Sequence, residues 1–146
     1  AVGALDQRGA YDRGMTRITL NGSSVLHNGG FPYSATVSAG PLLFTAGISP
    51  LDEEGVVVAA NDVVGQTRRC LENLSALLAE RGATPADLAK LTIYVAEHLQ
   101  ADLAVAWDAV VAELGESVPP AMMVGVTVLP YDEQVVEIDA VAALPA

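Results

Sequence analysis

The sequence predicts a single α+β domain with about six strands and two helices. Short segments that alternate apolar and polar residues indicate strands, and two longer stretches repeat apolar residues at helical spacing before a glycine. Composition is the third observation, because 51% of the residues are hydrophobic but only 5% are aromatic. Ala and Val dominate the apolar set, which favours a mixed sheet packed closely against helices that cover one of its faces.

The first part of the chain predicts a leader and several short strands. Residues 1–15 are polar and without periodicity, so we expect a leader or N-terminal extension before one domain that spans 16–146. The strands expected next, in chain order, are 16–20, 33–38, 42–48 and 56–58, with a turn at 21–24 and a hairpin at Ala39-Gly40-Pro41.

Two helices follow in the pattern. The first is expected from an N-cap at Asn61 to Gly82, and the second covers 99–114 after a strand at 91–95. Cys70 and Trp107 lie on the apolar stripes, so we interpret both as core residues. The stripes consist of Val63, Thr67, Cys70, Leu71, Leu74, Leu77 and Leu78 on the first helix and Leu99, Leu103, Trp107, Val110 and Leu114 on the second.

The last third of the chain predicts two strands joined by a turn at 130–133. Val124, Val126 and Val128 alternate along the first of these strands, and Val135 and Val141 are expected on the same side of the second. Since the helices cover the other face, this side would be an exposed apolar surface. The pattern therefore predicts oligomerisation.

Charge and cysteine content exclude several classes of protein. The net charge is −11, with seven cations against eighteen carboxylates, which disfavours nucleic acid and membranes as partners. A single cysteine, no apolar run of membrane-spanning length and no signal-peptide pattern indicate a soluble cytoplasmic protein. His27 and His98 have no metal-ligand spacing around them, and no phosphate loop is present, so neither metal nor cofactor is expected.

Three motifs in order give a family resemblance over roughly 16–144. The motifs are Pro32-Tyr33-Ser34 with Ala39-Gly40-Pro41 to Leu51, Gln66-Thr67 and Leu74 with Leu91-Thr92-Ile93-Tyr94-Val95, and Pro119-Pro120 through Val124-Gly125-Val126 to Val136-Glu137-Ile138-Asp139-Ala140-Val141-Ala142. With these motifs the chain resembles the RidA/YjgF family of reactive-intermediate (enamine/imine) deaminases. This resemblance implies a chorismate-mutase-like α+β subunit, a homotrimer with a closed inner barrel, and ligand pockets at the subunit interfaces.

The chain departs from the family where an arginine is expected. In deaminating members an arginine grips the substrate carboxylate by two charge-assisted hydrogen bonds, and that position falls on Ala121. The position of a common family asparagine falls on Ala104, and Met122 and Met123 follow Ala121. Among the cations only Arg17 lies in a strand that could approach the pocket. We therefore expect a pocket without an anion grip and with apolar filling.

Other family positions are retained. Glu137 falls on the family glutamate that positions or activates the attacking water, and a carboxylate suits general acid/base work. Tyr33, Ala46 and Gly47 are expected to line the pocket with the residues named above. Other interpretations remain: Glu137 on a solvated strand face with Asp139, Tyr33 as a packing aromatic, the two methionines as filling, and His27 as an exposed loop residue or at the pocket rim.

Two functional hypotheses follow. The first is an enzyme for a neutral or cationic imine, enamine or related metabolite, by hydrolysis, tautomerisation, cyclisation or condensation, with Glu137 as acid/base. The second is a non-catalytic ligand-binding or regulatory trimer, because Ala121 and Ala104 are what a lost active site would show. An ordinary 2-imino acid deaminase or a ribonuclease fits less well, the latter because of the net charge of −11.

Overall fold

The fold consists of two sheets and two helices. The computed structural model describes residues 10–11 and 17–145. Most of the predicted leader, and the first residue of the strand predicted at 16–20, lie outside this part. The described elements are β1 (Ala10–Tyr11), β2 (Ile18–Asn21), β3 (Ser34–Val37), β4 (Leu42–Phe44), α1 (Val63–Glu80), β5 (Leu88–Val95), α2 (Gln100–Leu114), β6 (Ala121–Gly125) and β7 (Val136–Ala143), with 3-10 turns at Pro85–Asp87 and Gly115–Ser117.

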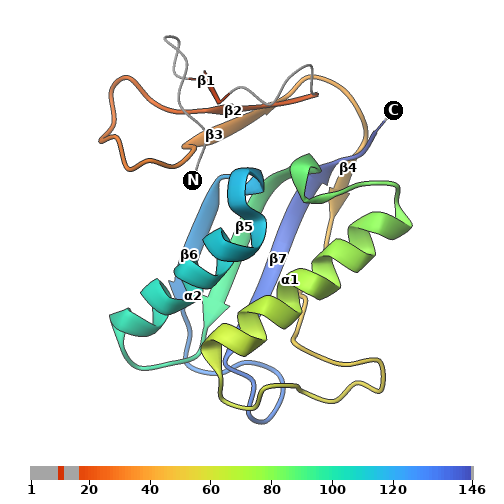
Figure 1. Ribbon diagram of the computed structural model, residues 1–146, viewed down its shortest axis with the longest axis vertical. Coiled ribbons are helices and arrows are strands. Elements are labelled where there is room, and N and C mark those ends of the chain that lie inside the picture. The colour runs from red at the N-terminus through yellow and green to blue at the C-terminus, as the bar shows by residue number, and fades with distance from the viewer. Residues whose placement is uncertain (1–9, 12–16, 146) are drawn as a thin grey trace.

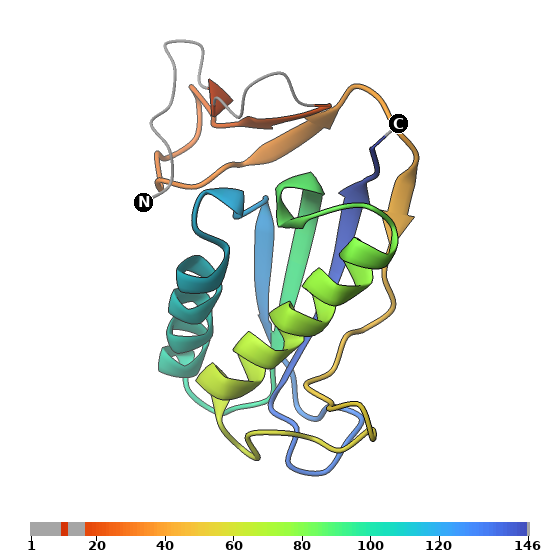
Figure 2. The same cartoon turned by 45° about the vertical axis from the view of Figure 1, so that its right-hand side comes forward.

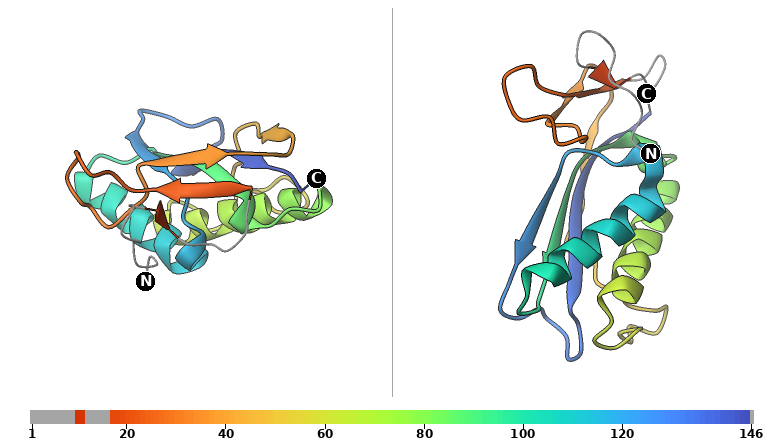
Figure 3. Two further views of the ribbon diagram at one scale, coloured as in Figure 1. Left: turned by 90° about the horizontal axis from the view of Figure 1, so that it is seen from above. Right: turned by 60° about the vertical axis from the view of Figure 1, so that its left-hand side comes forward.

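The main sheet is mixed and has both helices on one face. Its strand order is β4-β7-β5-β6, with β6 parallel to β5 and β7 antiparallel to both β5 and β4. Figures 1 and 2 show α1 and α2 in front of this sheet, and the edge-on view in Figure 3 shows them on a single side. The predicted α+β class with two helices on one face is confirmed.

The strand pairing differs from the prediction at two places. β6 and β7 were expected to meet across the turn at 130–133, but β5 lies between them. The hairpin predicted at Ala39-Gly40-Pro41 is also wrong, because β3 pairs with β2 and β4 pairs with β7. This turn instead carries the chain from one sheet to the other. Gly40 suits the turn because its φ is +94° and because a Cβ there would meet the carbonyl oxygen of Leu144.

The strands β1, β2 and β3 form a separate three-stranded sheet across one end of the main sheet (Figure 1). The six strands expected in one sheet are therefore divided between two. β1 belongs to the segment predicted as a leader, and it pairs through Ala10 with Asn21. The strand predicted at 56–58 is reduced to one bridge between Leu51 and Val57.

Helix α1 packs its apolar stripe on the sheet but also buries an amide. Gln66 is fully buried, and its Nε2 donates to the carbonyl oxygens of Ala59 (3.1 Å) and Glu133 (2.8 Å). Its Oε1 accepts from the backbone N–H groups of Val135 (2.7 Å) and Val136 (3.2 Å). Since all four hydrogen bonds of the amide are made, its burial costs little. The amide also fixes two loop segments to the helix, one before α1 and one before β7.

The helix ends differ slightly from the prediction. The N-cap of α1 is Asp62 rather than Asn61, which has a φ of 58°. Gly82, with a φ of +71°, lies two residues beyond the end of the helix. On α2 the predicted stripe is wrong at Leu99, which precedes the helix and is 66% exposed, while Val110 and Leu114 are buried as expected.

The core lies between the helices and the sheet, and the opposite face of the sheet is open. Strand β7 buries residues 136, 138, 140 and 142 toward the helices and turns 137, 139 and 141 to the open face. The open face carries the exposed side chains of Leu42, Phe44 and Met122. Val135, which was predicted there, packs in the core instead, because it precedes the strand and its N–H is held by Gln66. Neither helix of the described part is long and apolar enough to cross a membrane.

Replacing Gln66 by leucine is expected to destabilise the fold strongly. The change leaves the backbone N–H groups of Val135 and Val136 without their acceptor, at about 1–3 kcal/mol for each group that stays buried and unpaired. The carbonyl groups of Ala59 and Glu133 lose one donor each and keep the N–H groups of Asp62 and Asn61. The free energy of unfolding in urea should fall by at least about 2 kcal/mol. Gln100→Leu, the same exchange at an exposed position, should change it by less than about 0.5 kcal/mol. Equal stability of the two variants would contradict the structural role of Gln66.

Candidate functional site

Glu137 lies on the open face of β7 in a small polar cluster. It is opposite Tyr94 of β5 and is half-buried. The hydroxyl oxygen of Ser49 lies 3.3 Å from its Oε1. Asp139, two residues on, shares the face and accepts a hydrogen bond from the Tyr94 hydroxyl at 3.1 Å. Glu137 is thus held among polar partners beside the apolar residues of this face.

The segment 45–49 runs along β7 and brings Gly47 against Glu137. The segment is tied by hydrogen bonds from the Thr45 N–H to the carbonyl of Ala140 (3.0 Å) and between Ile48 and Ile138 in both directions (2.7 and 3.1 Å). Between these anchors Ala46 and Gly47 are exposed. A Cβ on Gly47 would meet Oε1 of Glu137, so a larger residue there would push the carboxylate out of this position.

Two residues that the sequence analysis did not single out complete this cluster. Gln134 is buried, and its Nε2 donates to Ser49 Oγ (2.9 Å) and to the carbonyl of Val136 (3.0 Å). Asn73 of α1 donates from Nδ2 to the carbonyls of Ser49 and Leu51, both at 3.0 Å. The available sequence signal for Gln134 was a single amide directly before the apolar pair Val135-Val136.

Ala121 lies in an apolar hollow on the other side of the sheet. The hollow has a volume of about 280 Å³, and no charged side chain belongs to its lining. Trp107, predicted as core, packs against the core and also forms a wall of this hollow. The lining residues are Phe31, Pro32, Trp107, Pro119, Ala121 and Met123.

The two methionines after Ala121 face opposite ways. Met123 packs against the core and lines the hollow, whereas Met122 is 52% exposed on the open face. This agrees with the rule that neighbouring strand residues point to opposite faces. Only Met123 can therefore share a site with Ala121 of the same chain.

Glu137 and Ala121 cannot meet within one chain. Ala121 is paired with Leu91, and Glu137 is paired with Tyr94 three residues further along the same central strand β5. Paired residues share a face and odd steps along a strand change it, so the two side chains point to opposite faces. The predicted site residues form two separate half-sites: one at Glu137 with Gly47 and Ser49, and the apolar hollow at Ala121.

The remaining predicted residues surround the hollow or lie apart from it. The Tyr33 ring contacts Phe31 with centroids 4.9 Å apart, and its hydroxyl donates to the carbonyl of His27 at 2.6 Å. His27 is thereby joined to the loop beside the hollow through its backbone. Ala104 is exposed on α2, one turn before Trp107, and does not line the hollow.

The arginines near the site are engaged elsewhere. Arg17 Nη2 lies 2.6 Å from Asp87 Oδ1 and donates to the carbonyl of Ala143 at 2.9 Å. Arg69 is half-buried and donates from Nε to the carbonyl of Leu51 at 3.0 Å. Arg68 pairs with Glu113 at 3.5 Å. None of these guanidinium groups belongs to the lining of the hollow.

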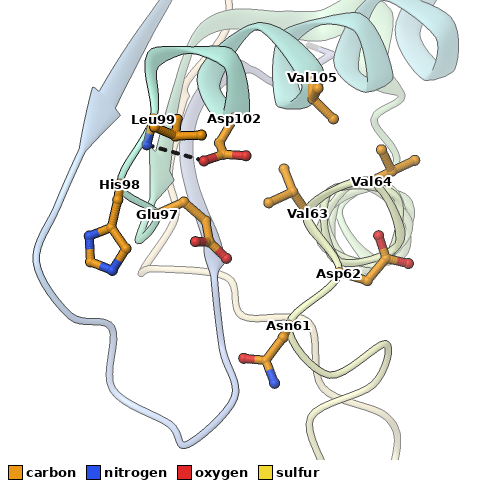
Figure 4. A pocket seen from close by; sticks show the side chains of 9 residues that line it. All are labelled: Asn61, Asp62, Val63, Val64, Glu97, His98, Leu99, Asp102 and Val105. Atoms are coloured by element: carbon orange, nitrogen blue, oxygen red, sulfur yellow. Dashed lines mark hydrogen bonds between the residues drawn. The ribbon is translucent and has the colours of Figure 1, made fainter.

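A second hollow lies where both helices begin (Figure 4). It has a volume of about 550 Å³ and contains three carboxylates, of which Asp102 accepts a hydrogen bond from the Leu99 N–H at 3.2 Å. The side chains that line it are Asn61, Asp62, Val63, Val64, Glu97, His98, Leu99, Asp102 and Val105. Across the described residues, no cluster of three or more His, Cys, Asp or Glu side chains could hold a metal ion.

Comparison with known proteins gives consistent relatives. The family described as Endoribonuclease L-PSP matches residues 29–144. A RutC family protein of Pyrococcus abyssi is 35% identical over 111 residues, covering 76% of this chain and 85% of the relative. A protein named 2-iminobutanoate/2-iminopropanoate deaminase, from Salmonella typhimurium, is 32% identical over 112 residues, covering 76% and 86%. A crystal structure of a conserved Rid family protein from Yersinia pestis has a TM-score of 0.80 at 28% identity, over 88% of this chain and 100% of that chain, which confirms the RidA-like fold.

Cys70 packs behind the Glu137 half-site on α1. Its side chain is fully buried, and Sγ lies 3.8 Å from the carbonyl oxygen of Val136. Burial, with a smaller contribution from the charge of Glu137, raises the pKa of the Cys70 thiol to about 12. At neutral pH the group is a protonated thiol that fills the core.

The thiol of Cys70 should therefore be inert in the native protein. With a pKa of about 12, roughly one thiol in ten thousand is ionised at pH 8, and reagent cannot reach it. Ellman's reagent should label no thiol in buffer and one per chain in denaturing urea. A Cys70→Ala variant that carries Ala79→Cys on the exposed side of the same helix is the positive control and should react at once. Rapid labelling of native Cys70 would contradict its placement in the core.

Proposed function

Because the chain belongs to the Endoribonuclease L-PSP family, also called RidA/YjgF, we propose that it is an enzyme for a neutral or cationic imine or enamine. The observation that carries the proposal is the combination of two half-sites. A hydrogen-bonded glutamate, Glu137, remains at one, and at the other the carboxylate-binding position is Ala121 in a hollow without charge.

The complete pocket forms between copies of the chain. The two half-sites lie on opposite faces of one sheet, so a second copy must bring its hollow to Glu137 of the first. Exposed apolar side chains on the open face, among them Phe44 (71% exposed) and Met122 (52% exposed), supply a surface for this association. A homotrimer with closed symmetry provides three such pockets and leaves none of these faces unpaired.

Glu137 acts as the acid/base in this pocket. In imine hydrolysis the carboxylate takes a proton from water while the water oxygen forms a bond to the imine carbon. It returns that proton to nitrogen, which gives a carbinolamine. The same carboxylate then takes the proton of the new hydroxyl group and passes it to nitrogen as the carbon–nitrogen bond breaks, which leaves a carbonyl product and ammonia. A positioned carboxylate of this kind contributes typically 10²–10⁴-fold to the rate.

The hollow determines which substrates enter. Its aromatic and aliphatic walls, with Trp107 and Met123, suit an apolar substituent, and Trp107 can also face a cation. An anionic substrate would find no cation in the hollow, and the carboxylate of the neighbouring half-site would repel it. The net charge of −11 acts in the same direction by attracting cations to the surface.

Non-catalytic ligand binding is the second candidate function. It is favoured by alanine at both Ala121 and Ala104, the positions at which the resemblance places an arginine and an asparagine in deaminating members. Ribonuclease activity, which the family name suggests, is disfavoured because a chain of net charge −11 repels a phosphate backbone.

Wild-type protein should fail to accelerate hydrolysis of 2-iminopropionate, and Ala121→Arg should gain this activity. A guanidinium that pairs with a desolvated carboxylate is worth on the order of 2–5 kcal/mol, so kcat/KM for this substrate should rise roughly 30- to 4,000-fold. The imine is generated in the assay from alanine by an amino-acid oxidase, and ammonia release is measured. Ala112→Arg, at an exposed position of α2, is the matched control and should gain nothing. Strong activity of the wild type would overturn the argument about Ala121.

Glu137→Gln should abolish turnover of an uncharged imine. The probe is the imine that an amine oxidase forms from phenylethylamine, and aldehyde release is followed. The amide cannot accept the proton from water, so kcat should fall by roughly 100-fold or more. Asp139→Asn, two residues further on the same face, should keep kcat within about threefold, and size-exclusion chromatography should show the same assembly for both variants. Unchanged turnover in Glu137→Gln would end the acid/base role, and ligand binding without turnover in wild type would favour the second candidate.

A further inference from the structure

Three polar side chains form a chain of hydrogen bonds that ends on Glu137. Gln134 Nε2 lies 2.9 Å from Ser49 Oγ, and Ser49 Oγ lies 3.3 Å from Glu137 Oε1. Gln134 is buried, whereas Ser49 and Glu137 are half-buried. The residues come from two segments that are far apart in sequence and are brought together along β7.

The direction of this chain is determined by the surroundings of Gln134. Its Oε1 accepts a hydrogen bond from the Tyr131 N–H at 3.2 Å, and its Nε2 donates to the carbonyl of Val136 at 3.0 Å. Both contacts require the amide orientation in which Nε2 faces Ser49. Ser49 Oγ therefore accepts from Gln134, and its own hydrogen is available to donate to Glu137.

Helix α1 anchors both backbone segments that carry these three side chains. Asn73 donates to the carbonyl of Ser49 at 3.0 Å, which fixes the backbone on which the hydroxyl stands. Gln66 accepts from the N–H groups of Val135 and Val136, which fixes the two residues that lie between Gln134 and Glu137 at the start of β7. The three hydrogen-bonded side chains are thus anchored to helix α1 rather than to a free loop.

We propose that Ser49 and Gln134 are positioning residues that fix the Glu137 carboxylate through Oε1 and leave Oε2 for the reacting water. This inference rests on the proposed function of Glu137 as acid/base. Within the described part of the chain, Oε1 receives the Ser49 hydroxyl and no group donates to Oε2. A donor at Oε1 fixes the rotation of the carboxylate, and Oε2 then takes the proton as the water oxygen bonds to the imine carbon.

Loss of the Ser49 hydroxyl should affect kcat more than KM. The apolar substituent of the substrate binds in the hollow, which contains neither Ser49 nor Gln134. A carboxylate that is free to rotate loses alignment with water, and misplacement by about 1 Å can cost roughly 100-fold in rate. Binding of the substrate is largely retained.

The experiment compares Ser49→Ala, Ser49→Thr and Thr45→Ala with the phenylethylamine-derived imine. In Ser49→Ala, kcat should fall roughly 10- to 100-fold with KM within about twofold, and Ser49→Thr, which keeps a hydroxyl, should restore kcat to within about threefold. Thr45→Ala is the matched control, since its Oγ1 on the same segment accepts from the Ala140 N–H and not from Glu137. It should keep kcat.

A second readout separates failure of this inference from failure of the proposed function. With ¹³C-labelled glutamate, the carboxyl resonance of Glu137, assigned through Glu137→Gln, should move in Ser49→Ala and stay in place in Thr45→Ala at the same pH. Inactive wild type would refute the proposed function, and with it the catalytic role of these hydrogen bonds. The resonance would still test the contact between Ser49 and Glu137. An unchanged resonance together with unchanged kcat in Ser49→Ala would overturn the positioning role.

Discussion

The buried amide of Gln66 is the interaction on which the rest of the structure depends. All four of its hydrogen bonds go to backbone atoms. One lies in the connection before α1, at Ala59, and three lie in the connection before β7, at 133–136. At about 1–3 kcal/mol for each buried group left unpaired, any shift of either connection would cost a large part of a typical domain stability. The amide thus fixes where β7 begins and therefore which face Glu137 occupies.

The alternation of β7 then divides the chemistry between two faces. With the start of the strand fixed, residues 136, 138, 140 and 142 must enter the core, and 137 and 139 must leave it. β5 transmits the same alternation to β6, which places Ala121 and Met123 on the helix side. A carboxylate on the open face and a hollow behind the sheet are a direct consequence, and a second copy is the means by which the proposed pocket joins them.

The sequence predicted those features that depend on local periodicity. Both helices, the strand that carries Glu137 and the burial of Cys70 and Leu74 follow from spacing of apolar residues and from composition. Strand order did not follow, because the insertion of β5 between β6 and β7 depends on pairing between distant segments. Gln66 and Gln134 were missed as buried residues since hydropathy assigns amides to the surface, and only the geometry of surrounding backbone groups makes their burial favourable.

The departure from the family pattern at Ala121 changes the charge of the proposed pocket. With Ala121 in place of a cation, the carboxylate of Glu137 is the only charge that faces the ligand from these two half-sites. An anionic ligand about 5 Å away would be repelled by about 3 kcal/mol at an effective dielectric constant of about 20, while a cation would be attracted by the same amount. An arginine in this place would both bind substrate and restrain the glutamate electrostatically. Without one, the orientation of Glu137 must come from neutral donors, and Ser49, supported by Gln134 and Asn73, supplies that orientation without adding a charge.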